Sequence, residues 1–128
     1  MKKRYTLIFI LLALALFILP ACALTNDLKG AGDVGKEFMN ALKNSDYEAS
    51  WNLVTPDIQT EIGGYSNWVD FATIRNFSDF SFSSTNVEND QATLDGEAKL
   101  AGDTYTVQLI LTKSGDNWLV AGIDFSLK

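Results

Sequence analysis

The sequence contains no histidine and only one cysteine, Cys22, among its 128 residues. Without histidine, the chain cannot build a Ser-His-Asp triad, a Cys-His dyad or an imidazole general base. A lone cysteine cannot form an intramolecular disulfide or a thiolate zinc cluster. Any catalysis would depend on carboxylates, tyrosines, lysines or backbone dipoles, and we expect neither a metal nor a cofactor.

Basic residues are also scarce. After residue 21 the chain keeps seven of them against sixteen acidic residues, a net charge of −9. Such a domain is repelled by phosphate backbones, so nucleic acid is not an expected partner. There is no glycine-rich phosphate loop, internal repeat or low-complexity segment. An acidic stretch over residues 86–97 has the length of an EF-hand loop, but its sixth position is Gln91 rather than glycine.

Long hydrophobic runs are limited to one, the 13 residues from Leu7 to Leu19. This run is shorter than the roughly 20 residues that span a bilayer as a helix. Lys2, Lys3 and Arg4 precede it, and Leu19-Pro20-Ala21-Cys22 ends it. That order resembles the signal peptide and lipobox of bacterial lipoproteins. The resemblance implies that residues 1–21 are removed and that Cys22 is acylated as the mature N-terminus.

Two alternatives to the lipoprotein interpretation stay open. Ala21-Cys22-Ala23 also fits an A-x-A cleavage site, which would release a soluble protein without the cysteine. Pro20 departs from the commonest lipobox and keeps this alternative open. The other is an uncleaved anchor. The position of the sole cysteine favours lipidation, and hence export to a bacterial cell membrane or outer membrane with the domain outside the cytoplasm.

The mature chain begins with small and polar residues and then becomes periodic. Residues 22–32 end in Gly30-Ala31-Gly32 and predict a flexible tether. From Asp33 the pattern is helical, with one apolar stripe made by Val34, Phe38, Met39 and Leu42. The domain is therefore expected to span residues 33–128.

Three further helices are predicted by caps and apolar faces. Ser45-Asp46-Tyr47-Glu48 is a capping box that opens a helix to about Val54. Thr55-Pro56 caps the next, which runs to Ile62 and ends at Gly63-Gly64. A fourth, from Ser66 to about Arg75, has an apolar face made by Trp68, Val69, Phe71, Ala72 and Ile74.

After Asn76 the period changes from 3.6 to 2, which indicates strands. Apolar residues alternate with polar ones around Phe80 and Phe82, from Ala92 to Leu100, and from Tyr105 to Leu111. The last run changes face between Val120 and Ile123, so Gly122 is predicted to mark a bulge. Short turns between the runs predict an antiparallel four-stranded meander. Helices followed by strands indicate an α+β fold, with the helices on the inner face of a curved sheet.

Four features of this domain recur together: a first amphipathic helix, a second helix that opens on Asp46-Tyr47-Glu48-Ala49-Ser50-Trp51, the segment Leu53-Val54-Thr55-Pro56-Asp57, and the closing strand Gly115-Asp116-Asn117-Trp118-Leu119-Val120. Over residues 31–127 this combination resembles small bacterial lipoproteins of the nuclear transport factor 2-like superfamily. It implies a cone in which a curved sheet and helices enclose an apolar pocket. Family members use that pocket either for binding or for catalysis.

The function we expect is a non-catalytic binding or accessory domain for a small apolar ligand or an envelope protein. The candidate ligand-binding residues are Trp51, Tyr65, Trp68, Phe80, Phe82, Tyr105, Trp118 and Asp124. The outer sheet face carries a mildly apolar stripe, Thr106, Gln108, Ile110 and Thr112, which suits a homodimer. The membrane is the remaining expected partner, through the lipid on Cys22.

The alternative is a pocket enzyme of the isomerase or dehydratase type that uses only aspartate and tyrosine. Such chemistry needs a carboxylate base beside an apolar cavity, with a tyrosine or protonated acid to stabilise an enolate. The chain has the right residue types in Tyr47, Tyr65, Tyr105, Asp70 and Asp124. None of them matches a catalytic position of the family, so no catalytic residue is assigned.

Overall fold

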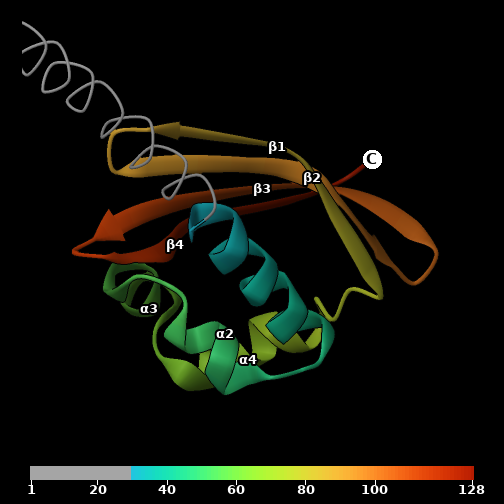
Figure 1. Cartoon of the computed structure of the whole chain (residues 1–128). Coiled ribbons are helices and arrows are strands. Elements are labelled where there is room, and N and C mark those ends of the chain that lie inside the picture. Colours follow the sequence, from blue (N-terminus) through green and yellow to red (C-terminus); the bar gives the residue numbers. More distant parts are fainter. Residues whose placement is uncertain (1–29) are drawn as a thin grey trace, which may run out of the picture.

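Helices precede strands, in the order that the change of periodicity predicts. The computed structural model describes residues 30–128. Residues 30–43 are helical, and they are followed by α2 (Tyr47–Asn52), α3 (Pro56–Ile62), α4 (Tyr65–Thr73), β1 (Asp79–Glu88), β2 (Gln91–Leu100), β3 (Asp103–Ser114) and β4 (Asn117–Leu127). The helices cover one face of the sheet (Figure 1). The predicted signal peptide and Cys22 lie outside the described residues.

The first described helix begins earlier than the sequence predicts. Residues 30–32, expected at the end of the tether, are helical, and the side chain of Ala31 is fully buried. Ala31 extends the apolar stripe by one turn before Val34. Gly30 lies against Trp118, whose Cδ1 would be 3.2 Å from an added Cβ. Residues 30–32 therefore belong to the packed helix and not to the tether. Gly30 is small enough to let this helix lie close to Trp118 of β4.

The turn before α2 differs from the predicted capping box. The N–H of Asp46 donates to the Ala41 carbonyl and that of Ser45 to the Leu42 carbonyl, at 2.8 and 3.1 Å. This pattern ends the preceding helix with Ser45 in the left-handed region at φ 55°. Ser45 therefore cannot be the cap, and the Asp46 carboxylate instead accepts from the Ala49 N–H at 3.2 Å.

The α2 helix also ends at Asn52, before the predicted Val54, because the chain then pairs with β4. Val54 forms a parallel bridge to Val120. The N–H of Thr55 donates to the Val120 carbonyl at 2.9 Å, and the Val120 N–H donates to the Leu53 carbonyl at 2.7 Å. This bridge fixes the start of α3 beside the last strand.

The ends of α3 follow the sequence closely. Thr55 accepts from the Ile58 N–H at 3.3 Å, and Gly63 ends the helix with φ 89°. The α4 helix begins at Tyr65 and ends at Thr73. Ile74 was expected on its apolar face, but its side chain is 64% exposed because the helix has ended before it. None of the described helices has the length and hydropathy that a membrane crossing requires.

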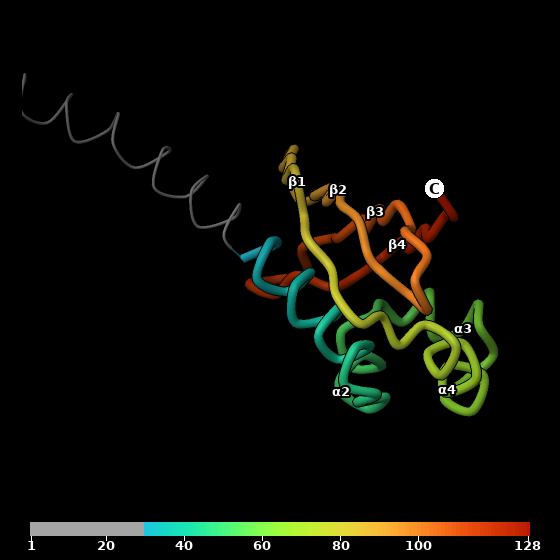
Figure 2. The backbone as a smooth tube through the Cα atoms, turned by 90° about the vertical axis from the view of Figure 1, so that its right-hand side faces the viewer, coloured from blue at the N-terminus to red at the C-terminus, as the bar shows by residue number. Residues whose placement is uncertain are grey.

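The sheet is the predicted antiparallel meander, in the order β1-β2-β3-β4. It curves over the helices (Figure 2). A bulge lies where the sequence predicts one: Ile110 pairs with Gly122 and Leu111 with Val120, so the extra residue is Ala121. A second bulge in β1, which the sequence analysis did not predict, leaves Ser83 without a register partner.

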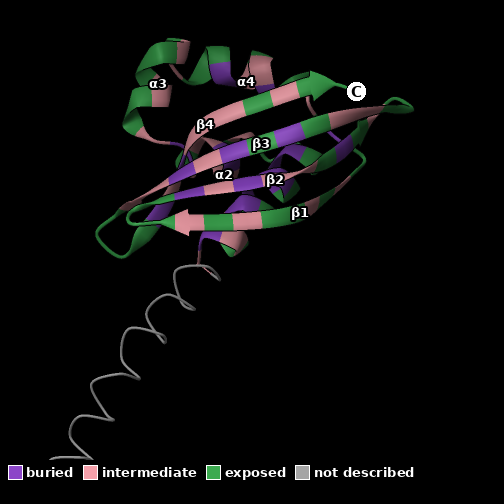
Figure 3. Cartoon of the chain, turned by 90° about the horizontal axis from the view of Figure 1, so that it is seen from above, coloured by how far each residue is buried: buried purple, intermediate pink, exposed green. Residues whose placement is uncertain are grey.

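Burial alternates along β2 and β3, as Figure 3 shows from the outer side of the sheet. The inner residues of both strands join the helices in one core that includes Phe38, Met39, Leu42, Trp68 and Leu109. The α3 and α4 helices emerge beyond the β4 edge in the same view. The fold is thus confirmed as α+β, with the helices packed on a curved four-stranded meander.

Candidate functional site

A cleft of about 510 Å³ lies where α3 and α4 meet β4. This volume falls within the range of roughly 300 to 1,000 Å³ that is usual for small-molecule sites. Seven of its residues are apolar or glycine and one is acidic: Ile58, Glu61, Ile62, Trp68, Phe71, Ala121, Gly122 and Ile123. The α3 and α4 helices lie side by side in Figure 2, and α3 also contacts β4.

Local sequence explains the two walls of this cleft. Ile58 and Ile62 stand four residues apart on α3, so they share one face of that two-turn helix. The opposite wall is the bulged segment of β4, in which Ala121 is the extra residue. A bulge bends the strand locally, and here it adds a residue beside the cleft. Gly122 packs closely on β3, since an added Cβ would lie 3.2 Å from the Cβ of Ile110 and would require a small shift there.

Trp68 forms the innermost wall and is held rigidly. Its Nε1–H donates to the Ser50 hydroxyl at 2.9 Å, and that hydroxyl donates to the Tyr47 carbonyl at 3.0 Å. The ring stacks on Phe71 at 5.0 Å between centroids and lies 6.1 Å from the ring of Trp51. A buried indole with its polar atom satisfied adds apolar area without an unpaired donor.

Two charged residues flank this apolar surface. The exposed Glu61 lines the α3 side of the cleft. On the α4 side, Cζ of Arg75 lies 3.9 Å from the centroid of the Phe71 ring, and its Nη1 donates to the Phe71 carbonyl at 2.9 Å. Desolvation by burial lowers the pKa of the Arg75 guanidinium, and the nearby Tyr105 opposes that shift by raising it.

Of the candidate ligand-binding residues, the structure places only Trp68 in the wall of the cleft. Trp51 packs behind Trp68, and the half-exposed Tyr65 packs edge-on against Trp51 at 5.7 Å. Tyr105 lies farther along the inner face, edge-on to Phe77 at 5.9 Å. Trp51, Tyr65 and Trp68 thus form one aromatic cluster, and Tyr105 belongs to a second one with Phe77 and Phe125. Trp51, Tyr65 and Tyr105 do not line the cleft.

The other four candidates lie elsewhere. Phe80 and Phe82 form an edge-on pair on β1 at 5.9 Å, partly buried against the core. Trp118 is 5% exposed and lines a separate hollow beside Gly30. Asp124 is exposed and accepts from the Ser126 hydroxyl at 3.2 Å. The eight candidate residues do not form a single site, because they lie on different helices and strands.

The acids and tyrosines considered for catalysis are also dispersed. Asp70 is exposed on α4, and Asp124 belongs to the outer sheet face with Gln108 as its register partner. The Tyr47 hydroxyl accepts from the Thr73 hydroxyl at 3.4 Å. No cluster of three potential metal-binding side chains occurs within residues 30–128. The carboxylate that does line the cleft, Glu61, was not among the residues that the sequence singled out.

Sequence reasoning thus missed most of the cleft: Ile58, Glu61, Ile62, Ala121, Gly122 and Ile123. One signal was present, since Ile58 and Ile62 form an apolar pair on an otherwise polar short helix. The bulge predicted beside Gly122 was a second, because bulges often adjoin functional sites. Nothing in the linear pattern shows that these two segments meet.

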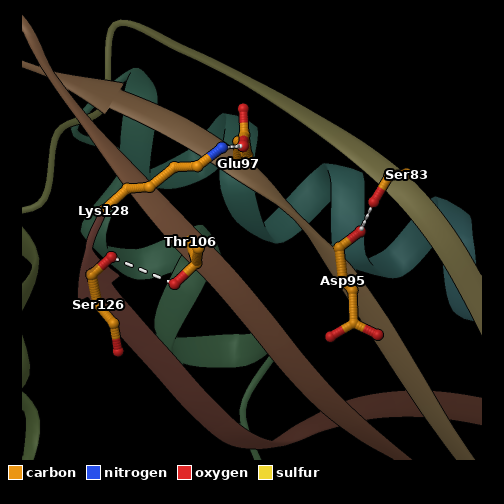
Figure 4. A network of polar contacts seen from close by, with 6 residues as sticks. All are labelled: Ser83, Asp95, Glu97, Thr106, Ser126 and Lys128. Carbon is orange, nitrogen blue, oxygen red and sulfur yellow. Dashed lines mark hydrogen bonds and ion pairs between the residues drawn. The ribbon is translucent and has the colours of Figure 1, made fainter.

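The outer face of the sheet is polar and makes its own hydrogen bonds (Figure 4). Ser83 donates to the Asp95 carbonyl and Thr106 to the Ser126 carbonyl, each at 3.2 Å. Lys128 pairs with Glu97. Gln108, part of the stripe considered for a homodimer, donates to the Asp95 carboxylate at 3.0 Å. This face therefore differs in character from the apolar cleft on the other side.

Comparison with known proteins identifies a similar fold. No family profile matches the chain, and the search of curated proteins gives no significant match. Among solved structures, a proposed ketosteroid isomerase from Kribbella flavida DSM 17836 is similar, with a TM-score of 0.55 and 14% identity over 80% of each chain. A likeness at this identity concerns architecture alone. The chain has the α+β fold that nuclear transport factor 2-like proteins share with ketosteroid isomerases.

Proposed function

We propose that this protein is a membrane-anchored bacterial lipoprotein whose domain binds a small, mainly apolar ligand in the cleft between α3, α4 and β4. The observation that carries the proposal is the cleft itself: about 510 Å³, with seven apolar or glycine residues and Glu61 as its one acid. Concave apolar surfaces with a few polar groups at the rim are the usual form of small-molecule sites.

Binding is favoured over catalysis by the chemistry around the cleft. An isomerase or dehydratase would need a carboxylate base and an oxyanion-stabilising donor that face one apolar space. Asp70 and Asp124 are exposed outside the cleft, and Tyr47, Tyr65 and Tyr105 do not line it. The catalytic alternative would therefore depend on Glu61 alone. The rigid Trp68 wall suits a preformed binding surface.

The ligand proposal is tested by isothermal titration calorimetry with neutral probes, 1-octanol and 2-naphthol. We expect saturable binding of at least one probe. Ile62→Gln places an amide in the cleft wall and should weaken binding about tenfold, because polar groups without partners are costly to bury. Ile74→Gln is the matched control, since Ile74 is 64% exposed and lies outside the cleft. No saturable binding of either probe, or equal loss in both variants, would refute the proposal.

The anchor is tested by the intact mass of the protein purified from its native membrane. A diacyl or triacyl increment on a chain that begins at Cys22, absent from Cys22→Ser, is the expected result. A lipid-free chain that begins at Leu24 would instead support secretion after cleavage at the A-x-A site. That outcome would remove the anchor but leave the ligand proposal intact.

A further inference from the structure

Arg75 is the sole arginine of residues 30–128, where fifteen acids stand against six basic residues. Despite this excess of carboxylates, none of those described lies within ion-pair distance of its guanidinium. Its partners are the ring of Phe71 and the Phe71 carbonyl oxygen. Within residues 30–128 the protein thus holds its one arginine against an aromatic ring without neutralising its charge.

This arrangement leaves hydrogen-bond donors available. A guanidinium carries five N–H groups, and one nitrogen, Nη1, has an acceptor in the protein. No buried side-chain nitrogen or oxygen among residues 30–128 lacks a partner, so the remaining donors of Arg75 are accessible to solvent. Partial desolvation, which lowers the pKa of the group, also strengthens its attraction for an anion. The guanidinium of Arg75 can therefore donate hydrogen bonds to an anion that comes from outside the protein.

The guanidinium lies beside the cleft, although Arg75 is not one of the lining residues. Phe71 lines the cleft, and its ring centroid is 3.9 Å from Cζ of Arg75, so a molecule in contact with the Phe71 side chain would have one end near Arg75. Glu61 lines the α3 side of the same cleft and would repel an anion there. The two charges thus favour one orientation, with the anionic end of a ligand toward α4.

We propose that the cleft takes a small amphipathic carboxylate, with an apolar body against Ile62 and Phe71 and a carboxylate on the guanidinium of Arg75. The planar fork of arginine matches a carboxylate in a two-point contact, which lysine cannot reproduce. The inference rests on the proposed function, since it specifies the class of ligand for the same site.

The test compares acids with their neutral counterparts by isothermal titration calorimetry at pH 8. Octanoate and 1-octanol form an aliphatic pair, and 2-naphthoate and 2-naphthol an aromatic pair, so the two pairs distinguish the kind of apolar body. We expect each bound acid to bind more tightly than its alcohol. Arg75→Gln should weaken the acid about tenfold, equivalent to about 1.4 kcal/mol, and leave the alcohol unchanged. Arg75→Lys should give an intermediate loss.

The matched control is Lys36→Gln, which removes one positive charge from an exposed position on the helix of residues 30–43, outside the cleft. It should leave the affinity for both acids unchanged. If the alcohols bind but Arg75→Gln leaves acid binding unaltered, or if Lys36→Gln weakens it equally, the carboxylate inference is overturned while the apolar site stands. If no probe binds at all, the proposed function itself fails.

Discussion

At the scale of single residues, one buried hydroxyl determines how the cleft wall is held. Ser50 is fully buried, and its oxygen accepts from Trp68 at 2.9 Å while donating to the Tyr47 carbonyl at 3.0 Å. This pairing lets a tryptophan lie in the core with no unsatisfied donor. It also fixes the orientation of the indole that Phe71 stacks upon.

Ser50→Ala should lower the free energy of unfolding by about 1–3 kcal/mol, because the Trp68 N–H loses its acceptor in a buried site. Urea denaturation followed by tryptophan fluorescence measures this. Ser126→Ala is the control, since it removes an exposed hydroxyl on the outer sheet face and should change stability by less than about 0.5 kcal/mol. Equal effects of the two substitutions would mean that the Ser50 hydroxyl does not stabilise the indole.

At the scale of elements, the cleft depends on a helix too short to be stable alone. The α3 helix has seven residues, fewer than the roughly 12 that an isolated helix needs to be even marginally stable. Its ends are therefore important: Thr55 caps the first turn, and Gly63 adopts the left-handed conformation that closes the last. Both signals were readable in the sequence.

Thr55→Ala should destabilise the domain by about 1 kcal/mol through loss of the cap. It should also weaken binding of 2-naphthol, because fraying of the first turn displaces Ile58 from the cleft wall. Thr60→Ala in the same helix removes an exposed threonine that caps nothing and should be neutral or slightly stabilising. Thermal unfolding and calorimetric titration of both variants check this. An undiminished affinity in Thr55→Ala would show that the cap does not hold the cleft.

Local signals predicted the elements much better than the site. The change of period at Asn76 separates helices from strands, and the change of face after Val120 locates the bulge at Ala121 within one residue. The position of the α2 cap was mistaken because Ser45 and Asp46 both favour capping, and the end of the preceding helix decides between them. The cleft was missed because its walls come from segments about sixty residues apart in sequence.

At the scale of the whole molecule, the core extends closer to the expected membrane tether than the sequence pattern indicates. Ala31 is completely buried within the core cluster, and Gly30 lies against Trp118 of β4. The helix of residues 30–43 also places Gly35 close to Leu94, where an added Cβ would lie 3.0 Å from a side-chain carbon. The N-terminal helix is therefore part of the packed domain from residue 30 onward.

This boundary makes a prediction about truncation. A chain that begins at residue 33 should be less stable than one that begins at residue 30 by about 1–2 kcal/mol, because it loses the buried Ala31 and almost one turn of helix. Urea denaturation of both chains, each with the same initiator methionine, measures the difference. A chain that begins at residue 30 and carries Gly32→Ala serves as the control, since no atom lies within 4 Å of an added Cβ there and alanine favours the helix; it should be at least as stable. If the two truncated chains were equally stable, residues 30–32 would contribute nothing to the fold, and the domain would begin at Asp33 as the sequence predicts.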